Sequence, residues 1–226
     1  MEDGNLMNKL NVLYEDNHII VVEKPVNVLS QGDATKDLDL LTMVKQYVKI
    51  KYNKPGNVYI GLVHRLDRPV GGIMVFARSS KAAARLTKQI QNHEFKKTYL
   101  AVVRGKMKQD TGTLEDKILK LEDGNSIISN KGKEAILNYK VLEYNSFEDM
   151  TLVSIDLKTG RHHQIRVQFA NNKHPLCGDQ RYGKEVDKTQ IALYAYQLSF
   201  IHPTTKEIMS FELKPAKVGY WAKFIK

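Results

Sequence analysis

The densest group of chemically active side chains is His64-Arg65-Leu66-Asp67-Arg68-Pro69, with Gly71 and Gly72 close behind it. An aspartate that two arginines approach in space is held in its charged form. Such a carboxylate suits a nucleophile or a general base and does not suit a proton donor. The alternative that the residues leave open is a solvent-exposed Asp-Arg turn between two strands.

A second polar group extends from Lys158 to Arg166 and contains two adjacent histidines. We predict a helix over residues 161–171. On that helix His162 and Arg166 lie four residues apart on one face, near the N-terminal end. An arginine and an imidazole at a helix N-terminus favour an anion or a carboxylate as ligand.

The sequence predicts no metal site. His162 and His163 point about 100° apart on a helix, and no acidic or cysteine partner follows at the spacing of metal ligands. The single cysteine, Cys177, excludes an internal disulfide framework and a multi-cysteine zinc site. A thiol nucleophile paired with His174 or His162 is the alternative, but a lone cysteine is more often a packing residue.

A third group is the segment 97–105, which contains Lys97 and has the β-branched and aromatic composition of a strand. Tyr99, Ala101 and Val103 share one face of that strand. Tyr99 therefore either stacks on a nucleic-acid base or fills the core, and the pattern alone favours the core.

The charge of this 226-residue chain is clustered. The formal net charge is +10 and the pI is near 9.4. Residues 78–108 hold nine basic residues against one acidic residue, and residues 158–184 hold six against one. These two stretches carry more than the whole net charge, which is typical of proteins that bind the phosphates of nucleic acids. An acidic membrane surface is disfavoured because no strongly apolar helix face accompanies the charge.

The elements that must position these groups are mostly strands. Turn residues between β-branched runs predict strands over residues 10–14, 18–23, 58–63, 72–77, 98–103, 113–121, 126–129, 135–143, 150–157, 191–201 and 207–213. Helical spacing adds helices over residues 38–52 and 217–224 and behind an N-cap at Ser79 or Ser80. Without a regular βαβ alternation, this order predicts an α+β fold, a mainly antiparallel mixed sheet with flanking helices.

The helix behind the Ser79 or Ser80 cap is amphipathic. Ala83, Leu86 and Ile90 lie on the face that packs against the core, and the opposite face is a basic stripe. We predict contacts with the phosphate backbone of a nucleic acid for the basic residues of this region, Lys81, Arg85, Lys88 and Lys97.

The composition is that of one globular domain. Apolar residues make up 42% and charged residues 27%, which excludes disordered, collagen-like and coiled-coil chains. No apolar run approaches the length of about 18 residues that a membrane span needs, and the first residues lack the pattern of a signal peptide. We therefore predict a single domain over residues 1–226, a cytoplasmic location and no obligate protein partner.

Taken together, the motifs resemble the RNA pseudouridine synthases of the RluA type. The resemblance spans roughly residues 10 to 214, nearly the whole chain, and its motifs stand in the family's order. They are Lys24-Pro25, His64-Arg65-Leu66-Asp67, Lys97-Thr98-Tyr99-Leu100-Ala101, Thr159-Gly160-Arg161-x-His163-Gln164-Ile165-Arg166, His174-Pro175-Leu176-x-Gly178-Asp179-x-x-Tyr182-Gly183 and Ala192-Leu193-x-Ala195-x-x-Leu198-x-Phe200-x-His202-Pro203.

The resemblance implies a catalytic domain of the pseudouridine synthase fold, without an N-terminal S4-type module. It implies that Asp67 is the essential carboxylate, that Arg166 pairs with it and that Tyr99 stacks on the target uracil. Arg65 would occupy the space of a flipped nucleotide, and His64 would support the loop. Further substrate contacts would come from Arg161, His163 and Gln164. Neither a cofactor nor a metal is implied, because the reaction is an isomerisation.

The implied partner is structured RNA, either ribosomal or transfer RNA, and the chain would isomerise a specific uridine in it. One alternative is a non-catalytic RNA-binding or ribosome-assembly protein on the same fold, which explains the charge but not Asp67, Tyr99 and Arg166. The other is a hydrolytic nuclease, for which His162 and His163 are the candidate acid and base.

Overall fold

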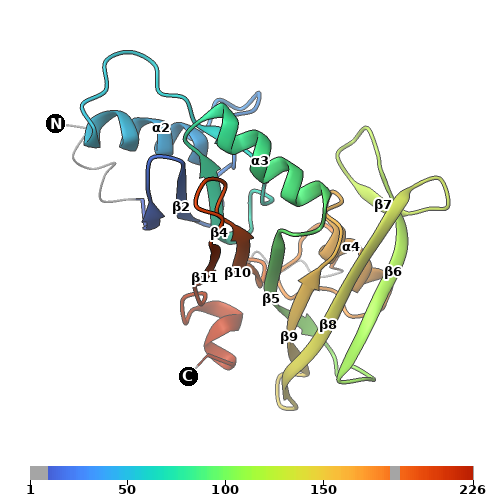
Figure 1. The fold of residues 1–226 in the computed structure, drawn as a ribbon. Helices are drawn as coiled ribbons and strands as arrows, with labels where there is room; N and C mark the ends of the chain where they lie inside the picture. The colour runs from blue at the N-terminus through green and yellow to red at the C-terminus, as the bar shows by residue number, and fades with distance from the viewer. Residues whose placement is uncertain (1–9, 184–188, 226) are drawn as a thin grey trace. The chain divides into compact units, whose positions relative to one another are not determined.

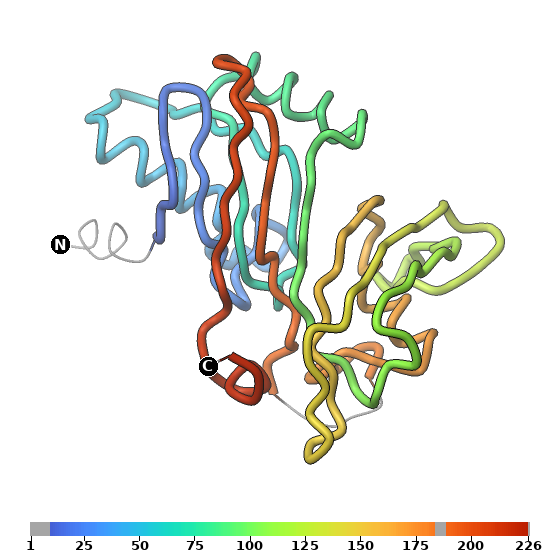
Figure 2. Tube along the Cα trace, turned by 60° about the horizontal axis from the view of Figure 1, so that its bottom comes forward, coloured from blue at the N-terminus to red at the C-terminus, as the bar shows by residue number. Residues whose placement is uncertain are grey.

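The computed structural model describes residues 10–183 and 189–225. The chain divides into two compact units. The first comprises Met1–Phe95 and Gln197–Leu213, and the second comprises Lys96–Tyr196 and Lys214–Lys226. Figure 1 labels most of their elements and Figure 2 traces the chain through them. Helices and a mixed sheet make up the fold, so the predicted α+β class is confirmed.

The first unit is built on strands in the order β1-β2-β4-β10, with β3 beside β4 and β11 beside β10. Its elements are β1 (Val12–Glu15), β2 (Ile19–Lys24), α2 (Leu40–Lys51), β3 (Gly61–Leu62), β4 (Gly71–Ala77), α3 (Ser80–Gln91), the end of β10 (Leu193–Ile201) and β11 (Ile208–Glu212). β2 pairs with β1 and β4, and β11 pairs with β10, all antiparallel. Each element lies within a few residues of its predicted place.

One face of these strands forms an apolar core with α3. Ile73 and Val75 of β4 alternate with residues that point to the other face, and they pack with Leu86 of α3 and Phe200 of β10. On the opposite face, Met74 lies against Ser30, 3.6 Å from its hydroxyl oxygen. β4 is buried on both faces, which explains its continuous apolar sequence.

α3 begins where its sequence predicts. Ser79 is the N-cap, and its hydroxyl accepts a hydrogen bond of 3.2 Å from the backbone N–H of Ala82. Lys81 and Lys88 are exposed on the side away from the core. Arg85 is half-buried and donates to the carbonyl of Pro203 at 2.8 Å, so part of its guanidinium serves the fold.

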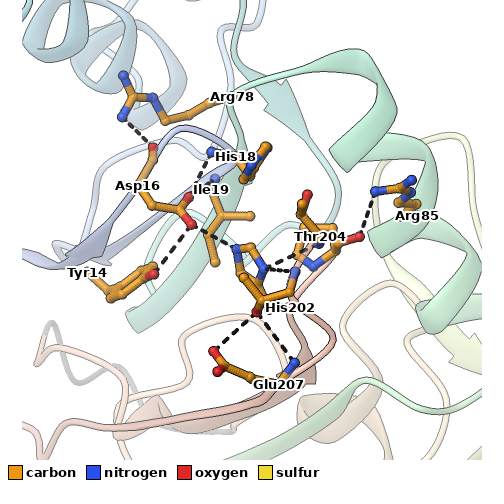
Figure 3. Close-up of polar contacts among 11 residues, drawn as sticks. Tyr14, Asp16, His18, Ile19, Arg78, Arg85, His202, Thr204 and Glu207 are labelled. Carbon is orange, nitrogen blue, oxygen red and sulfur yellow. Dashed lines mark hydrogen bonds and ion pairs between the residues drawn. The ribbon is translucent and has the colours of Figure 1, made fainter.

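Asp16, in the turn between β1 and β2, is the centre of a polar network (Figure 3). Its carboxylate accepts 2.7 Å hydrogen bonds from the N–H groups of His18 and Ile19. The ring of His202, from the turn after β10, binds the same carboxylate at 2.9 Å. Because Nδ1 of His202 accepts from the N–H groups of Thr204 and Thr205, its Nε2 carries the proton toward Asp16. The network ties the two turns together.

The second unit is built on an antiparallel sheet in the order β5-β9-β8-β6-β7. Its elements are β5 (Lys96–Arg104), β6 (Thr111–Lys120), β7 (Ser126–Ile128), β8 (Lys133–Asn145), β9 (Met150–Leu157), α4 (Gln164–Asn171), the start of β10 and a 3-10 turn (Gly219–Lys223). Figure 2 shows β8 and β9 side by side as a long hairpin, which one register shift interrupts after Val141. No helix of the described ranges is long and apolar enough to cross a membrane.

Candidate active site

In the first unit, Asp67 lies half-buried in the loop that joins β3 to β4. Its carbonyl accepts a hydrogen bond of 3.0 Å from the N–H of Val70, which closes a tight turn. Gly72, at the start of β4, has a φ of 125°, in a region that side-chain-bearing residues rarely occupy. The turn and the glycine fix the backbone on the carboxyl-terminal side of Asp67.

Two buried side chains, Ser30 and Lys24, form hydrogen bonds with the backbone of this loop. The hydroxyl of Ser30 accepts from the N–H of Leu66 at 3.1 Å and donates to its carbonyl at 2.8 Å. Lys24 is completely buried, and its ammonium donates to the carbonyls of Pro25, Val28 and Arg68 at 3.0, 2.5 and 3.0 Å. Asp67 is therefore flanked by two anchored peptide groups, at Leu66 and Arg68.

The buried position of Lys24 disfavours the charged form of its side chain. Burial and, to a smaller extent, the charge of Arg68 lower the pKa of Lys24 from 10.5 to about 7, against the opposing effect of the Asp67 carboxylate. In the sequence, Lys24 stands out only as part of the Lys24-Pro25 motif. Nothing in the local sequence shows that this lysine is buried beneath the Asp67 loop.

The other polar side chains of the loop differ in their contacts and exposure. His64 accepts from the N–H of Val75 at 3.1 Å through Nε2, and its ring lies 5.4 Å from that of Phe95. The supporting part of His64 stays a prediction. Arg65 is exposed, and Arg68 pairs with the Asp37 carboxylate at 2.7 Å.

In the second unit, Tyr99 lies on β5 with 7% of its surface exposed, in register with Ile155 of β9. Lys97, two residues earlier, is half-buried, and burial lowers the pKa of its ammonium. A side chain built at Gly160 would lie 3.6 Å from the Lys97 nitrogen. The start of β5 is therefore next to the turn that precedes α4.

The helix predicted over residues 161–171 begins only at Gln164. His163 has left-handed backbone angles, φ 54° and ψ 23°, which stop the helix from extending toward its N-terminus. The prediction that His162 and Arg166 share a helical face is therefore wrong. The rings of His162 and His163 instead stack at 3.7 Å and an interplanar angle of 28°.

Gln164 and Arg161 hold the turn before α4. The amide oxygen of Gln164 accepts from the hydroxyl of Thr159 at 2.8 Å and from the N–H of Arg161 at 2.9 Å. Its amide nitrogen donates to the carbonyl of Ile136, and Arg161 donates through Nε to the carbonyl of Glu134. Gln164 is buried, while Arg161 and His163 are half-buried, and their contacts with substrate stay predictions.

Arg166, on α4, is buried and forms a fork with Asp179. Its Nε donates to Oδ2 at 2.8 Å and its Nη2 donates to Oδ1 at 2.7 Å. Burial alone would raise the pKa of Asp179, but the hydrogen bonds from Arg166 and from the N–H groups of Arg181 and Tyr182 hold that pKa below its usual range. In the sequence, Asp179 belongs to the His174-Pro175-Leu176-x-Gly178-Asp179 motif, and no part in the site was predicted for it.

The predicted residues thus fall into two groups, which we describe separately. His64, Arg65 and Asp67 share one loop of the first unit, whereas Lys97, Tyr99, Arg161, His163, Gln164 and Arg166 belong to the second unit.

Within the part of the chain that the structure describes, no group of three or more histidine, cysteine or acidic side chains could hold a metal ion.

Comparison with known proteins identifies the family. The family model described as RNA pseudouridylate synthase matches residues 18–171, more than half of the chain. The chain belongs to this family. An uncharacterized RNA pseudouridine synthase of Aquifex aeolicus is 34% identical over 218 residues, which cover 91% of this chain and 69% of that protein. The ribosomal large subunit pseudouridine synthase C of Buchnera aphidicola is also 34% identical, with 91% and 66% covered.

The RluA-type resemblance is therefore confirmed, and with it the class of enzyme, an isomerase. Solved structures agree on the fold. Human RNA pseudouridylate synthase domain containing 4 aligns with a TM-score of 0.80 at 20% identity, over 95% of this chain and 93% of that chain. Human RNA pseudouridylate synthase domain containing 1 aligns with a TM-score of 0.76 at 23% identity, over 94% and 86%.

Proposed function

We propose that this RNA pseudouridine synthase isomerises a specific uridine in ribosomal RNA, with Asp67 as its essential carboxylate. Membership of the family supports the isomerisation of uridine. The names of relatives such as the ribosomal large subunit synthase C favour ribosomal over transfer RNA as the substrate. The observation that supports Asp67 is the construction of its loop. Buried Lys24 and Ser30 anchor the peptide groups on both sides of it, as a reacting group that must be held in one place requires.

The reaction breaks the N1–C1′ bond of uridine and forms a C5–C1′ bond to the same uracil after it has rotated. The C5 proton leaves to solvent and N1 gains a proton, so atoms and electrons balance without an oxidant or a co-substrate. Asp67 acts on the sugar, as a nucleophile at C1′ or as the base that removes the C2′ proton, and both routes need the ionised carboxylate.

The other site residues follow from the family resemblance. Tyr99 stacks on the target uracil, and Arg166 stabilises the reacting carboxylate. The uridine leaves its stack to reach these groups, and Arg65, exposed on the Asp67 loop, takes the space that it vacates. Exposed Lys81 and Lys88 on α3 neutralise nearby phosphates.

Release of tritium from RNA labelled at C5 of uridine tests the proposal. Wild-type protein should release tritium from unmodified ribosomal RNA, and Asp67→Asn should bind the RNA with unchanged affinity but release none. Asp33→Asn is the matched control, since Asp33 is an exposed turn residue of the same unit, and it should keep the wild-type rate.

Turnover by Asp67→Asn would remove Asp67 from the essential role. Tight RNA binding without tritium release by the wild type would favour the non-catalytic RNA-binding alternative. Release from transfer RNA and not from ribosomal RNA would correct the substrate class. The nuclease alternative has no support in a family of isomerases, and intact RNA after the reaction would close it.

A further inference from the structure

Arg166 is held on one edge by a carboxylate that is itself fixed. The Asp179 side chain is fully buried, and both of its oxygens accept from the guanidinium. Oδ1 also accepts from the N–H groups of Arg181 at 3.0 Å and Tyr182 at 3.2 Å. Four N–H donors therefore set the orientation of this carboxylate, and two of them come from the backbone of its own loop.

The backbone around Asp179 is closely packed, with no space for a side chain at two glycines. At Gly178, where φ is 74°, an added Cβ would lie 2.6 Å from the carbonyl oxygen of Gln190. At Gly183 it would lie 2.5 Å from the carbonyl oxygen of Asp179. Both distances are shorter than a carbon and an oxygen tolerate. This packed backbone carries the N–H groups of Arg181 and Tyr182, which bind the Asp179 carboxylate.

Tyr182 fixes the guanidinium from a second direction. The carbon at the centre of the Arg166 guanidinium lies 5.2 Å from the centre of the Tyr182 ring. The Tyr182 hydroxyl in turn accepts from the N–H of Ser126 at 2.9 Å and shares a 2.7 Å hydrogen bond with Nδ1 of His163. The ring is thus anchored to β7 and to the residue that precedes α4.

We propose that Asp179 and Tyr182 are positioning residues, which set the plane and direction of the Arg166 guanidinium for the reaction. This inference rests on the proposed function, in which Arg166 acts on the reacting carboxylate. Asp179 binds the Nε edge of the guanidinium through two parallel hydrogen bonds, a planar fork that only arginine offers. This fork fixes the direction in which the remaining N–H groups of Arg166 point.

Stability alone does not account for this arrangement. A buried ion pair is often no more stabilising than an apolar pair of similar volume, because both charges lose their hydration. A buried arginine with one edge clamped by a carboxylate and one face against a tyrosine ring is oriented in both its plane and its direction. A misplacement of about 1 Å at such a group can slow a reaction by about a hundredfold.

The test is a double-mutant cycle on single-turnover tritium release at saturating RNA. Asp179→Asn should slow the step by about 10- to 100-fold and Tyr182→Phe by less, with RNA dissociation constants within about twofold of wild type. Arg166→Lys should slow it further. Adding Asp179→Asn to Arg166→Lys should then change the rate by less than about threefold, because Asp179 acts only through the fork.

The matched control is Asp123→Asn, since Asp123 also caps a turn of the second unit, where it accepts from the N–H of Asn125 at 2.8 Å. It should leave the rate unchanged. A wild-type rate for Asp179→Asn would overturn the proposal, and so would losses that multiply in the double variant. If Asp179→Asn does not fold, Tyr182→Phe decides, and a wild-type rate for that variant overturns the role of Tyr182.

A second readout does not depend on activity. The Nε–H of Arg166 should give a nuclear magnetic resonance signal that exchanges slowly with water, because it is buried against Asp179. The signal should exchange fast in Asp179→Asn and stay slow in Asp123→Asn. Rapid exchange in the wild type contradicts the fork. Slow exchange together with no tritium release would instead retain the fork and refute the proposed function.

Discussion

Replacement of Lys24 by methionine should change how stability depends on pH. In the folded protein burial lowers the pKa of Lys24 to about 7, whereas an unfolded chain restores the ordinary value near 10.5. Between these values the unfolded state binds a proton that the folded state does not hold. The free energy of unfolding therefore rises with pH in this window, and below pH 7 the group contributes no pH dependence.

The size of the effect follows from the two pKa values. Each pKa unit corresponds to about 1.4 kcal/mol, and integration from pH 7 to pH 10 gives about 3.5 kcal/mol for this one group. The wild type should gain that amount of stability relative to Lys24→Met over this range. Comparison with the variant removes the contributions of other groups, such as Lys97, that titrate in both proteins.

The assay is urea unfolding of both proteins at pH 7, 8, 9 and 10, with the midpoint and slope fitted at each pH. Lys45→Met is the control, because Lys45 is exposed on α2 in the same unit, and its difference from the wild type should be flat. A Lys24→Met difference that is equally flat would refute the argument. It would mean that the ammonium keeps its proton beneath the Asp67 loop throughout this range.

Two further predictions concern the Asp67 loop and the RNA surface. Gly72→Ala should destabilise the protein by about 1–3 kcal/mol, because φ at Gly72 is 125°, and unchanged urea unfolding would contradict the strain. Joint replacement of Lys81 and Lys88 by alanine should reduce the log–log salt dependence of RNA binding by about 0.7–0.9 for each lost phosphate contact. An unchanged slope would mean that this face of α3 does not contact RNA.

Most elements could be predicted because their signals are local. The cap at Ser79 and the β-branched run of β4 specify their structures over a few neighbouring residues. The start of α4 could not be predicted in this way. His163 adopts left-handed angles while its ring stacks on His162 and binds the Tyr182 hydroxyl, and Tyr182 lies nineteen residues away. Tertiary contacts therefore override the helical pattern of residues 161–163.

The candidate site was predicted unevenly for a similar reason. Asp67 was proposed because its neighbours are unusual in type, and Arg166 because it lies in a motif. The residues that hold them, Lys24 and Asp179, lie 43 and 13 positions away and reach them only in the fold. A lysine or an aspartate read in isolation is expected on the surface. Their burial was the property that the sequence did not display.

The positions of the buried charged residues support the same two groups, the Asp67 loop and the Arg166–Asp179 pair. Among the described residues, the buried side chains of lysine, arginine and acidic type are Lys24, Asp39, Arg166 and Asp179. Asp39 has a local reason, since it caps α2 by accepting from the N–H of Thr42 at 3.0 Å. The other three lose hydration without serving a helix end, and an apolar core would avoid that loss. Lys24 braces the loop of Asp67, and Asp179 braces Arg166. Buried charges retained at such positions are the pattern expected of an active site, and they support the parts proposed for Asp67 and Arg166.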